Sequence, residues 1–167
     1  PRITTHLALV GRAFGADRFL LAGDEDQDMF DNLKSVEERF GKGLECEYIK
    51  SPMGWLRKFV EEDAGDGLPG VAVHLTMYGE PFREAIPKMR RDRPVVVIVG
   101  GAKVPPEVFK LSQYNVAVGN QPHSEVAALG LFLDSWHGGN TSDRKFEDAR
   151  LIIEPSAKGK KVIDLDR

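Results

Sequence analysis

The sequence is poor in the features that hold small secreted or membrane-bound proteins together. It has one cysteine, Cys46, which cannot form a disulfide within the chain and favours a reducing compartment such as the cytoplasm. No apolar run approaches the roughly 20 residues that a membrane-spanning helix needs, so no membrane partner is expected. Because 167 residues can bury an adequate core without bridges or metals, we expect one ordinary globular domain.

A large excess of charge of one sign is also absent, because 23 Lys and Arg side chains oppose 26 Asp and Glu side chains. Proteins that coat nucleic acid without specificity are usually basic, so any nucleic-acid contact here must come from a local patch. The charge is unevenly distributed. Residues 1–82 carry nine basic and fifteen acidic side chains, whereas residues 83–167 carry fourteen and eleven.

Common catalytic and nucleotide-binding motifs are missing as well. No G-x-G-x-x-G follows an expected strand, and neither the P-loop pattern nor the G-x-S-x-G nucleophile elbow occurs. The four histidines do not have the spacing of metal ligands, so no metal site is expected.

What is present is an alternation of short apolar runs with segments of helical periodicity, which is typical of an α/β fold with a mostly parallel sheet flanked by helices. We expect strands over residues 18–22, 44–49, 71–77, 95–99 and 115–118, helices over 5–14, 26–40, 53–63, 81–89, 105–112 and 124–136, and a terminal β-hairpin over 151–154 and 161–165. The run Val95–Val99 lacks polar alternation, which predicts a central strand buried on both faces.

Two of the expected helices carry unusual side chains. The helix at 124–136 is apolar on every side and contains small residues, which predicts close packing against either a second subunit or another part of this chain. We favour the homodimer. The helix at 26–40 follows an acidic cluster, which favours either a solvated helix N-terminus or a receiver-like signalling module that binds Mg²⁺ through Asp24, Glu25 and Asp26. The signalling module is disfavoured because the strand at 74–77 lacks an aspartate to accept a phosphoryl group.

Ligands of open parallel sheets bind beyond the carboxyl ends of the strands. Three expected strands end in loops that combine Gly or Pro with polar side chains, over residues 74–81, 100–106 and 119–125. Glycine lets the backbone approach a ligand closely, and the last two loops lead into helix N-termini, where N–H groups point outward. The sequence therefore predicts a binding site at these loops.

The third loop and the helix after it, residues 114–129, closely resemble the archaeal tRNA 2'-O-methyltransferases that modify cytidine 56, members of the SPOUT superfamily. Segments 4–16, 74–79 and 146–162 also match, so the resemblance covers nearly the whole chain. It implies a tRNA ribose 2'-O-methyltransferase with a single SPOUT domain over residues 1–167 and a C-terminal trefoil knot. Members of the family begin with a further strand, so we expect an N-terminal strand to be missing before Pro1.

The resemblance also implies S-adenosylmethionine as the methyl donor, bound mostly by backbone groups. The residues at the matching positions are Leu75, Gly100, Gly101, Ala102, Lys103, Val104, Val118, Gly119, Asn120, Gln121, Pro122, His123, Ser124 and Glu125. Within this set, His123 is expected either to relay a proton or to cap a turn. Ser124 is expected to cap its helix rather than to act in catalysis.

In related ribose methyltransferases, an arginine after the first helix is assigned to activation of the 2'-hydroxyl, and Arg12 matches that position. A free guanidinium is a poor base, so Arg12 is expected to orient the hydroxyl and to hold the adjacent phosphate. For the tRNA partner, two basic clusters are candidates, and either one is equally consistent with a solvated face. The first contains Arg83, Lys88, Arg90, Arg91 and Arg93, and the second contains Lys158, Lys160 and Lys161.

Overall fold

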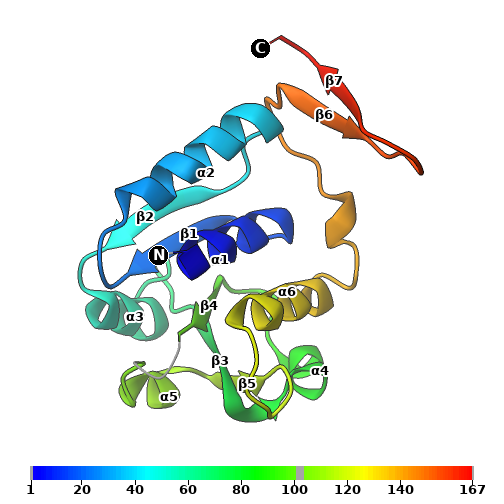
Figure 1. Ribbon diagram of the computed structural model, residues 1–167. Coiled ribbons are helices and arrows are strands. Elements are labelled where there is room, and N and C mark those ends of the chain that lie inside the picture. Colours follow the sequence, from blue (N-terminus) through cyan, green and yellow to red (C-terminus); the bar gives the residue numbers. More distant parts are fainter. Residues whose placement is uncertain (1, 101–103, 167) are drawn as a thin grey trace.

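The computed structural model describes residues 2–100 and 104–166 (Figure 1). Helices and strands alternate along the chain as the sequence predicts. The helices are α1 (Arg2–Ala13), α2 (Gln27–Phe40), α3 (Pro52–Glu61), α4 (Phe82–Ala85), α5 (Glu107–Leu111) and α6 (Glu125–Trp136), with short 3-10 turns η1 (Ile86–Lys88) and η2 (Thr141–Asp143). The strands are β1 (Arg18–Ala22), β2 (Glu45–Ile49), β3 (Val71–Pro81), β4 (Val95–Val99), β5 (Tyr114–Ala117), β6 (Leu151–Glu154) and β7 (Lys161–Asp164).

The strands form three separate sheets. β1 and β2 are a parallel pair, β3 lies between β4 and β5 in a parallel sheet, and β6 and β7 form the antiparallel hairpin expected at the C-terminal end. The prediction that Val95–Val99 is the central strand is wrong, because β4 lies at an edge and its five residues are half-buried. The central strand is β3, which is buried from Val71 to Leu75. An apolar run indicates covered faces, but it carries no information on whether a strand has one hydrogen-bonded neighbour or two.

Helix α1 belongs to two parts of the core. Leu7 packs in the cluster formed by β3, β5, α4 and α6, whereas Ala8 packs with Leu21 of β1 and Met29 of α2. Figure 1 accordingly shows α1 between the β1–β2 pair with α2 and the β3 sheet with α6. Burial on two adjacent sides of α1 thus joins the two sheets into one structure.

Helix α6 is covered by this chain on more than one side. Leu129, Phe132 and Leu133 are buried in the core, and a Cβ at Gly130 would lie 3.7 Å from Cγ1 of Val10 in α1. The side chain of Val10 thus packs at Gly130 at ordinary van der Waals distance, so α1 of the same chain covers this side of α6. Leu131 stays 47% exposed, so this side of α6 is only partly covered by the residues that the structure describes.

The acidic cluster is the start of a solvated helix, as expected. Oδ1 of Asp26 accepts a hydrogen bond from the backbone N–H of Met29 at 3.1 Å and so caps α2. Among the residues that the structure describes, no group of three or more His, Cys, Asp and Glu side chains could hold a metal ion. In the same residues, no helix is both long and apolar enough to cross a membrane.

Candidate active site

The carboxyl ends of three parallel strands bring the predicted binding loops to one edge of the sheet. Leu75 of β3 pairs in register with Val99 of β4 and with Val116 of β5, so the chain leaves all three strands at the same level. The segments beyond these positions include residues 76–80 at the irregular end of β3, residues 100 and 104–106, and residues 118–124. Gly101, Ala102 and Lys103, which the sequence assigns to the cofactor, lie outside the described residues.

The first loop departs from regular sheet geometry. Leu75 and Glu80 both lie opposite Val116 of β5, so the residues between them leave the β-ladder. The side-chain amide of Asn120 in the third loop donates to the carbonyl oxygens of Met77 at 2.7 Å and Gly79 at 3.1 Å. The first and third loops are thus hydrogen-bonded to each other, which fixes the backbone around the candidate cofactor site.

His123 and Ser124 shape the third loop from within. The ring of His123 lies between two backbone carbonyls, with Nε2 at 2.5 Å from the oxygen of Val118 and Nδ1 at 3.0 Å from that of Ser124. Oγ of Ser124 accepts from the N–H groups of Val126 and Ala127, at 3.1 and 3.4 Å, which confirms it as the N-cap of α6. The contacts of His123 are those of a residue that caps a turn.

The rest of the loops offer backbone groups and open space. Gly119 is exposed with φ of +79°, a conformation that glycine adopts without strain, and an added Cβ there would meet no atom within 4 Å. Gln121 and Pro122 are exposed, whereas Val104 and Glu125 are half-buried and Val118 and Leu75 are buried. Exposed peptide groups beside buried apolar side chains suit a ligand with a flat apolar ring and a polar tail.

Arg12 lies in the last turn of α1 and is only 7% exposed. Its Nη2 donates to the carbonyl oxygen of Gly41 at 2.5 Å, and its guanidinium carbon lies 4.1 Å from the ring centroid of Phe146. Burial lowers the pKa of Arg12, nearby Glu37 raises it and nearby Arg144 lowers it. The Nε of Arg12 is buried and has no hydrogen-bond partner among the described residues, so this arginine keeps one donor unused.

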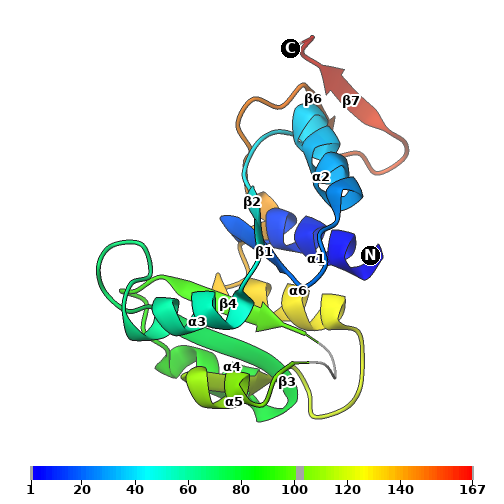
Figure 2. The same ribbon diagram turned by 90° about the vertical axis from the view of Figure 1, so that its left-hand side faces the viewer.

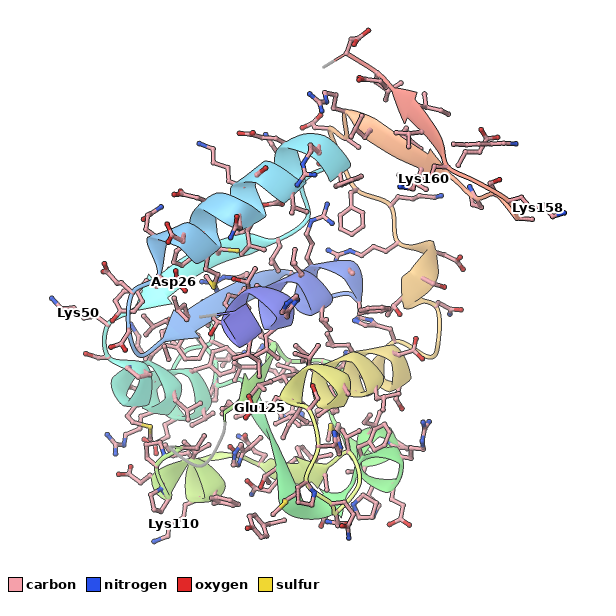
Figure 3. The ribbon with its side chains drawn as sticks, viewed as in Figure 1. Asp26, Lys50, Lys110, Glu125, Lys158 and Lys160 are labelled. Atoms are coloured by element: carbon pink, nitrogen blue, oxygen red, sulfur yellow. The ribbon has the colours of Figure 1, made fainter. Side chains whose placement is uncertain are left out.

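The structure does not bring Arg12 and the cofactor loops together within one chain. α1 and α6 pack side by side in the same direction, since Val10 lies against Gly130 and Gly15 lies against His137, which follows the end of α6. The cofactor loops precede the start of α6, near the labelled Glu125 (Figure 3). Val10 lies against Gly130, near the middle of α6, so Arg12 lies beside the C-terminal half of this helix, whereas Ser124 precedes its first residue.

The four arginines predicted to bind RNA have different environments. Arg83 is exposed and stacks on Phe82, whereas Arg90 is exposed and forms an ion pair with Asp92 at 2.8 Å. The guanidinium of Arg91 lies 3.6 Å from the ring centroid of Trp136 and donates to the Trp136 carbonyl oxygen at 2.8 Å.

Arg93 is already used by the fold. Its side chain is 11% exposed, and it donates to both carboxylate oxygens of Asp66 at 2.6 and 2.7 Å and to the carbonyl oxygens of Leu68 and Pro69. Arg93 therefore anchors the turn before β3, and we remove it from the set of cations available to RNA.

The second basic cluster lies far from the first. Lys158 and Lys160 are at the exposed turn of the hairpin, which projects from the body of the protein at the end opposite α4 (Figures 2 and 3). The two clusters therefore belong to opposite ends of the molecule.

The segment before the hairpin contains functional candidates that the sequence reasoning missed. Arg144 and Phe146 both contact Arg12, although 132 residues separate Arg144 from Arg12 along the chain. Nothing in composition, spacing or periodicity links positions so far apart.

Comparison with known sequences identifies the family. A family model described as tRNA ribose 2'-O-methyltransferase, aTrm56, matches residues 40–163. The chain belongs to this family. It is 47% identical over 96% of its length to the tRNA (cytidine(56)-2'-O)-methyltransferase of Methanopyrus kandleri, of which it covers 87%. The enzyme of the same name from Methanocaldococcus jannaschii is 46% identical over 97% of this chain, which covers 88% of that protein.

Solved structures support the fold. The SpoU methyltransferase AviRb of Streptomyces viridochromogenes, crystallised with the cofactor AdoMet, matches 85% of this chain with a TM-score of 0.60 and 18% identity. This chain covers 54% of AviRb, or about half its length. The protein thus has the α/β fold of SPOUT methyltransferases, as the sequence resemblance implies. The comparisons do not support the receiver-like alternative.

Proposed function

We propose that this protein transfers a methyl group from S-adenosylmethionine to the 2'-hydroxyl of cytidine 56 in the T-loop of tRNA, in the cytoplasm. Membership of the tRNA ribose 2'-O-methyltransferase family is the observation that carries the proposal. Relatives whose names specify cytidine 56 are 40–47% identical to this chain over nearly its whole length, which supports that nucleotide as the target.

The three loops fit S-adenosylmethionine. The cofactor supplies a methyl group on a positively charged sulfonium sulfur, and the rest of the cofactor is a good leaving group because it departs as a neutral thioether. Backbone N–H and C=O groups of the three loops would make most of the contacts with it. The residues concerned are Leu75, Gly100, Val104, Val118, Gly119, Asn120, Gln121, Pro122, His123, Ser124 and Glu125. Gly101, Ala102 and Lys103 complete the second loop in this proposal. The Asn120 bonds to Met77 and Gly79 and the His123 contacts keep this backbone rigid before the cofactor binds. We further propose that these loops form the trefoil knot of a single SPOUT domain.

Arg12 is the proposed catalytic residue. Its guanidinium stays protonated and is a poor base, so its role is to orient the ribose hydroxyl and to neutralise the adjacent phosphate. The Nε–H of Arg12 has no hydrogen-bond partner among the described residues, but it is buried, so this role requires the Arg12 side chain to turn toward the tRNA when it binds. Alignment for in-line attack accounts for much of the rate gain in such a reaction.

The position of Arg12 supports a homodimer. Arg12 lies beside the C-terminal half of α6 and the third cofactor loop precedes its first residue, which favours a site that takes the two from different protomers. A two-fold dimer in which the two copies of α6 pack antiparallel would place Arg12 of one protomer toward the loops of the other. Leu131 on α6 and Ile3 on α1 are each 47% exposed, and they supply apolar surface for such an interface.

Methyl transfer to unmodified tRNA tests the proposed activity. With labelled S-adenosylmethionine, we expect methylation of cytidine 56, and we expect Arg12→Ala to lower kcat by about 100-fold or more. Binding of S-adenosylmethionine, measured by calorimetry, should be unchanged. Arg39→Ala, at an exposed arginine that also stacks on a phenylalanine, is the matched control. Unlabelled tRNA with the wild-type protein, or full activity of Arg12→Ala, would contradict the proposal.

Mixed dimers test whether the site is shared. Arg12→Ala and a cofactor-loop variant, Asn120→Ala with Gly119→Val, should each be inactive alone. When the two are coexpressed, half of the dimers are mixed and each mixed dimer has one complete site. About a quarter of the wild-type rate should therefore return. If no activity returns, each site lies within a single chain and the shared site is excluded. If the protein runs as a monomer in light scattering, the homodimer itself is excluded.

A further inference from the structure

The segment between α6 and the hairpin packs on the turn that receives Arg12. Residues 144–150 run along the turn after α2, where Lys42 and Glu147 form an antiparallel β-bridge with N···O distances of 2.7 and 3.3 Å. The backbone N–H of Arg150 also donates to the carbonyl oxygen of Arg39 at 3.1 Å. The segment is thus hydrogen-bonded to the turn at several points and does not hang freely.

Arg144 caps the end of α1. Its Nη1 donates to the carbonyl oxygens of Arg12 and Ala16, and its Nη2 donates to the carbonyl oxygen of Gly43 at 2.9 Å. The last carbonyls of a helix lack partners within the helix and are favoured by a nearby cation. One guanidinium therefore connects the backbone of the arginine-bearing turn to the turn after α2.

Phe146 contacts both guanidinium groups. Its ring centroid lies 4.1 Å from the guanidinium carbon of Arg12 and 4.9 Å from that of Arg144. The turn after α2 is shaped around this side chain, since an added Cβ would lie 2.7 Å from the Cβ of Phe146 at Gly41 and 2.7 Å from its ring at Gly43. A cation over an aromatic face is held in place more strongly when it is desolvated, and Arg12 is buried.

The aromatic ring of Phe146 offsets an excess of positive charge in this cluster. Arg12 and Arg144 carry the same charge, and the nearest carboxylate, Glu37, is already occupied by the N–H groups of Gly43 and Leu44 at 2.9 and 3.3 Å. The carbonyl oxygen of Gly41 accepts one bond from Arg12. The ring of Phe146 thus supplies attraction to both cations, which an aliphatic side chain of similar size would not.

We propose that Phe146 and Arg144 are positioning residues for methyl transfer, which hold the guanidinium of Arg12 at the place and angle from which it acts on the ribose. This inference rests on the proposed role of Arg12. Within one chain, the contacts of Arg144 and Phe146 do not include any described residue of the candidate cofactor loops, so both residues act on the reaction through Arg12.

Substitutions of Phe146 distinguish the effect of its aromatic face on kcat from the effect of side-chain packing. Phe146→Leu keeps an apolar side chain and removes the ring, whereas Phe146→Tyr keeps the ring. We expect Phe146→Leu to lower kcat by about 10-fold with unchanged binding of S-adenosylmethionine, and Phe146→Tyr to restore it. Phe40→Leu is the matched control, because Phe40 carries the guanidinium of Arg39 at 5.3 Å and does not contact Arg12.

A double-mutant cycle decides whether the effect passes through Arg12. Arg12→Met removes the guanidinium and its charge but keeps an unbranched side chain, and it should leave a measurable residual rate. In that background Phe146→Leu should change kcat by less than about twofold, because the group it positions is gone. The same 10-fold loss in both backgrounds would overturn the proposal, as would wild-type activity of Phe146→Leu.

The two hypotheses fail differently. If Arg12→Ala is fully active, the proposed role of Arg12 is wrong, whatever Phe146 does. If Arg12→Ala is inactive and Phe146→Leu is fully active, only the positioning role is wrong. Thermal melting of each variant identifies loss of fold, and Arg144→Lys gives a second route to the same result. That variant keeps the charge and loses the fork that bridges Arg12, Ala16 and Gly43.

Discussion

At the scale of single residues, the ion pair between Arg93 and Asp66 makes a specific contribution to stability. Hydrogen bonding to Arg93 lowers the pKa of Asp66 from 3.8 to about 2. A carboxyl group with a lower pKa in the folded chain stabilises the fold above its ordinary pKa, and this contribution is lost as the pH falls toward the lower value. We therefore expect part of the acid destabilisation between about pH 4 and pH 2 to come from Asp66.

Calorimetric melting at several pH values measures this contribution. In Asp66→Asn, the melting temperature should be lower than that of the wild type near neutral pH, and the difference should shrink as the pH falls toward 2. Glu38→Gln, at an exposed carboxylate of α2, is the control and should parallel the wild type. A constant difference between Asp66→Asn and the wild type at all pH values would contradict the assignment.

The roles of single residues were predictable to very different extents. The N-cap role of Ser124 follows from local sequence, because a serine directly before an apolar helical run has one common use. Arg93 was predicted to face RNA, since a run of basic residues does not reveal that one of them is bound by Asp66, 27 positions earlier. The partners of Arg12 in residues 144–146 were not predictable for the same reason.

At the scale of elements, the centre of β3 contains a buried histidine. Nδ1 of His74 lies 3.0 Å from Oδ1 of Asn115 in β5, and the Asn115 amide donates to the carbonyl oxygen of Phe109 at 2.9 Å. Because the Asn115 oxygen is the acceptor, His74 donates from Nδ1 and Nε2 carries no proton. The edge of the ring also packs on Phe109.

Protonation of His74 should loosen this strand pair. Burial lowers the pKa of His74 below 6.5, although its bond to Asn115 opposes the shift. The unfolded chain then binds a proton more readily than the folded chain, so stability falls as the pH drops below about 6.5. Urea unfolding at pH 7.5 and pH 5.5 should show this loss, and His74→Gln should reduce it. His6→Gln, at an exposed histidine of α1, should leave it unchanged. Equal pH dependence in wild type and His74→Gln would exclude His74 as the cause.

The types and order of the helices and strands could be predicted from periodicity, whereas the strand or helix that lies beside each of them could not. All five expected strands of the α/β part and both strands of the hairpin are present, with ends shifted by a few residues. The central position belongs to β3 instead of β4, and the helix cover of α6 includes α1. Hydrogen-bonded neighbours depend on contacts between distant segments, which a periodic pattern along one segment does not encode.

At the scale of the whole molecule, the net charge of −3 conceals two basic regions at opposite ends of the protein. A cation that already has an ion-pair or hydrogen-bond partner adds little to the affinity for a phosphate. In the first cluster, Arg93 is held by Asp66, Arg90 is paired with Asp92, and Arg91 is stacked on Trp136 and bonded to its carbonyl oxygen. This leaves Arg83 and Lys88 as exposed cations whose side chains have neither an ion pair nor a hydrogen bond to the backbone among the described residues. These two lie in the α4–η1 region, beside the sheet that supplies the cofactor loops. We therefore expect tRNA to contact this end of the protein.

The salt dependence of tRNA binding measures these contacts. Each cation that meets a phosphate contributes about 0.7 to 0.9 to the slope of log K against log salt concentration. Arg83→Gln with Lys88→Gln should therefore weaken tRNA binding and reduce the slope by roughly 1.4 to 1.8, while S-adenosylmethionine binding is unchanged. Lys34→Gln with Lys50→Gln, on the acidic half of the chain, is the control with the same change in charge. If the slope changes only in Lys158→Gln with Lys160→Gln, tRNA is bound by the hairpin, and the first cluster is a solvated face.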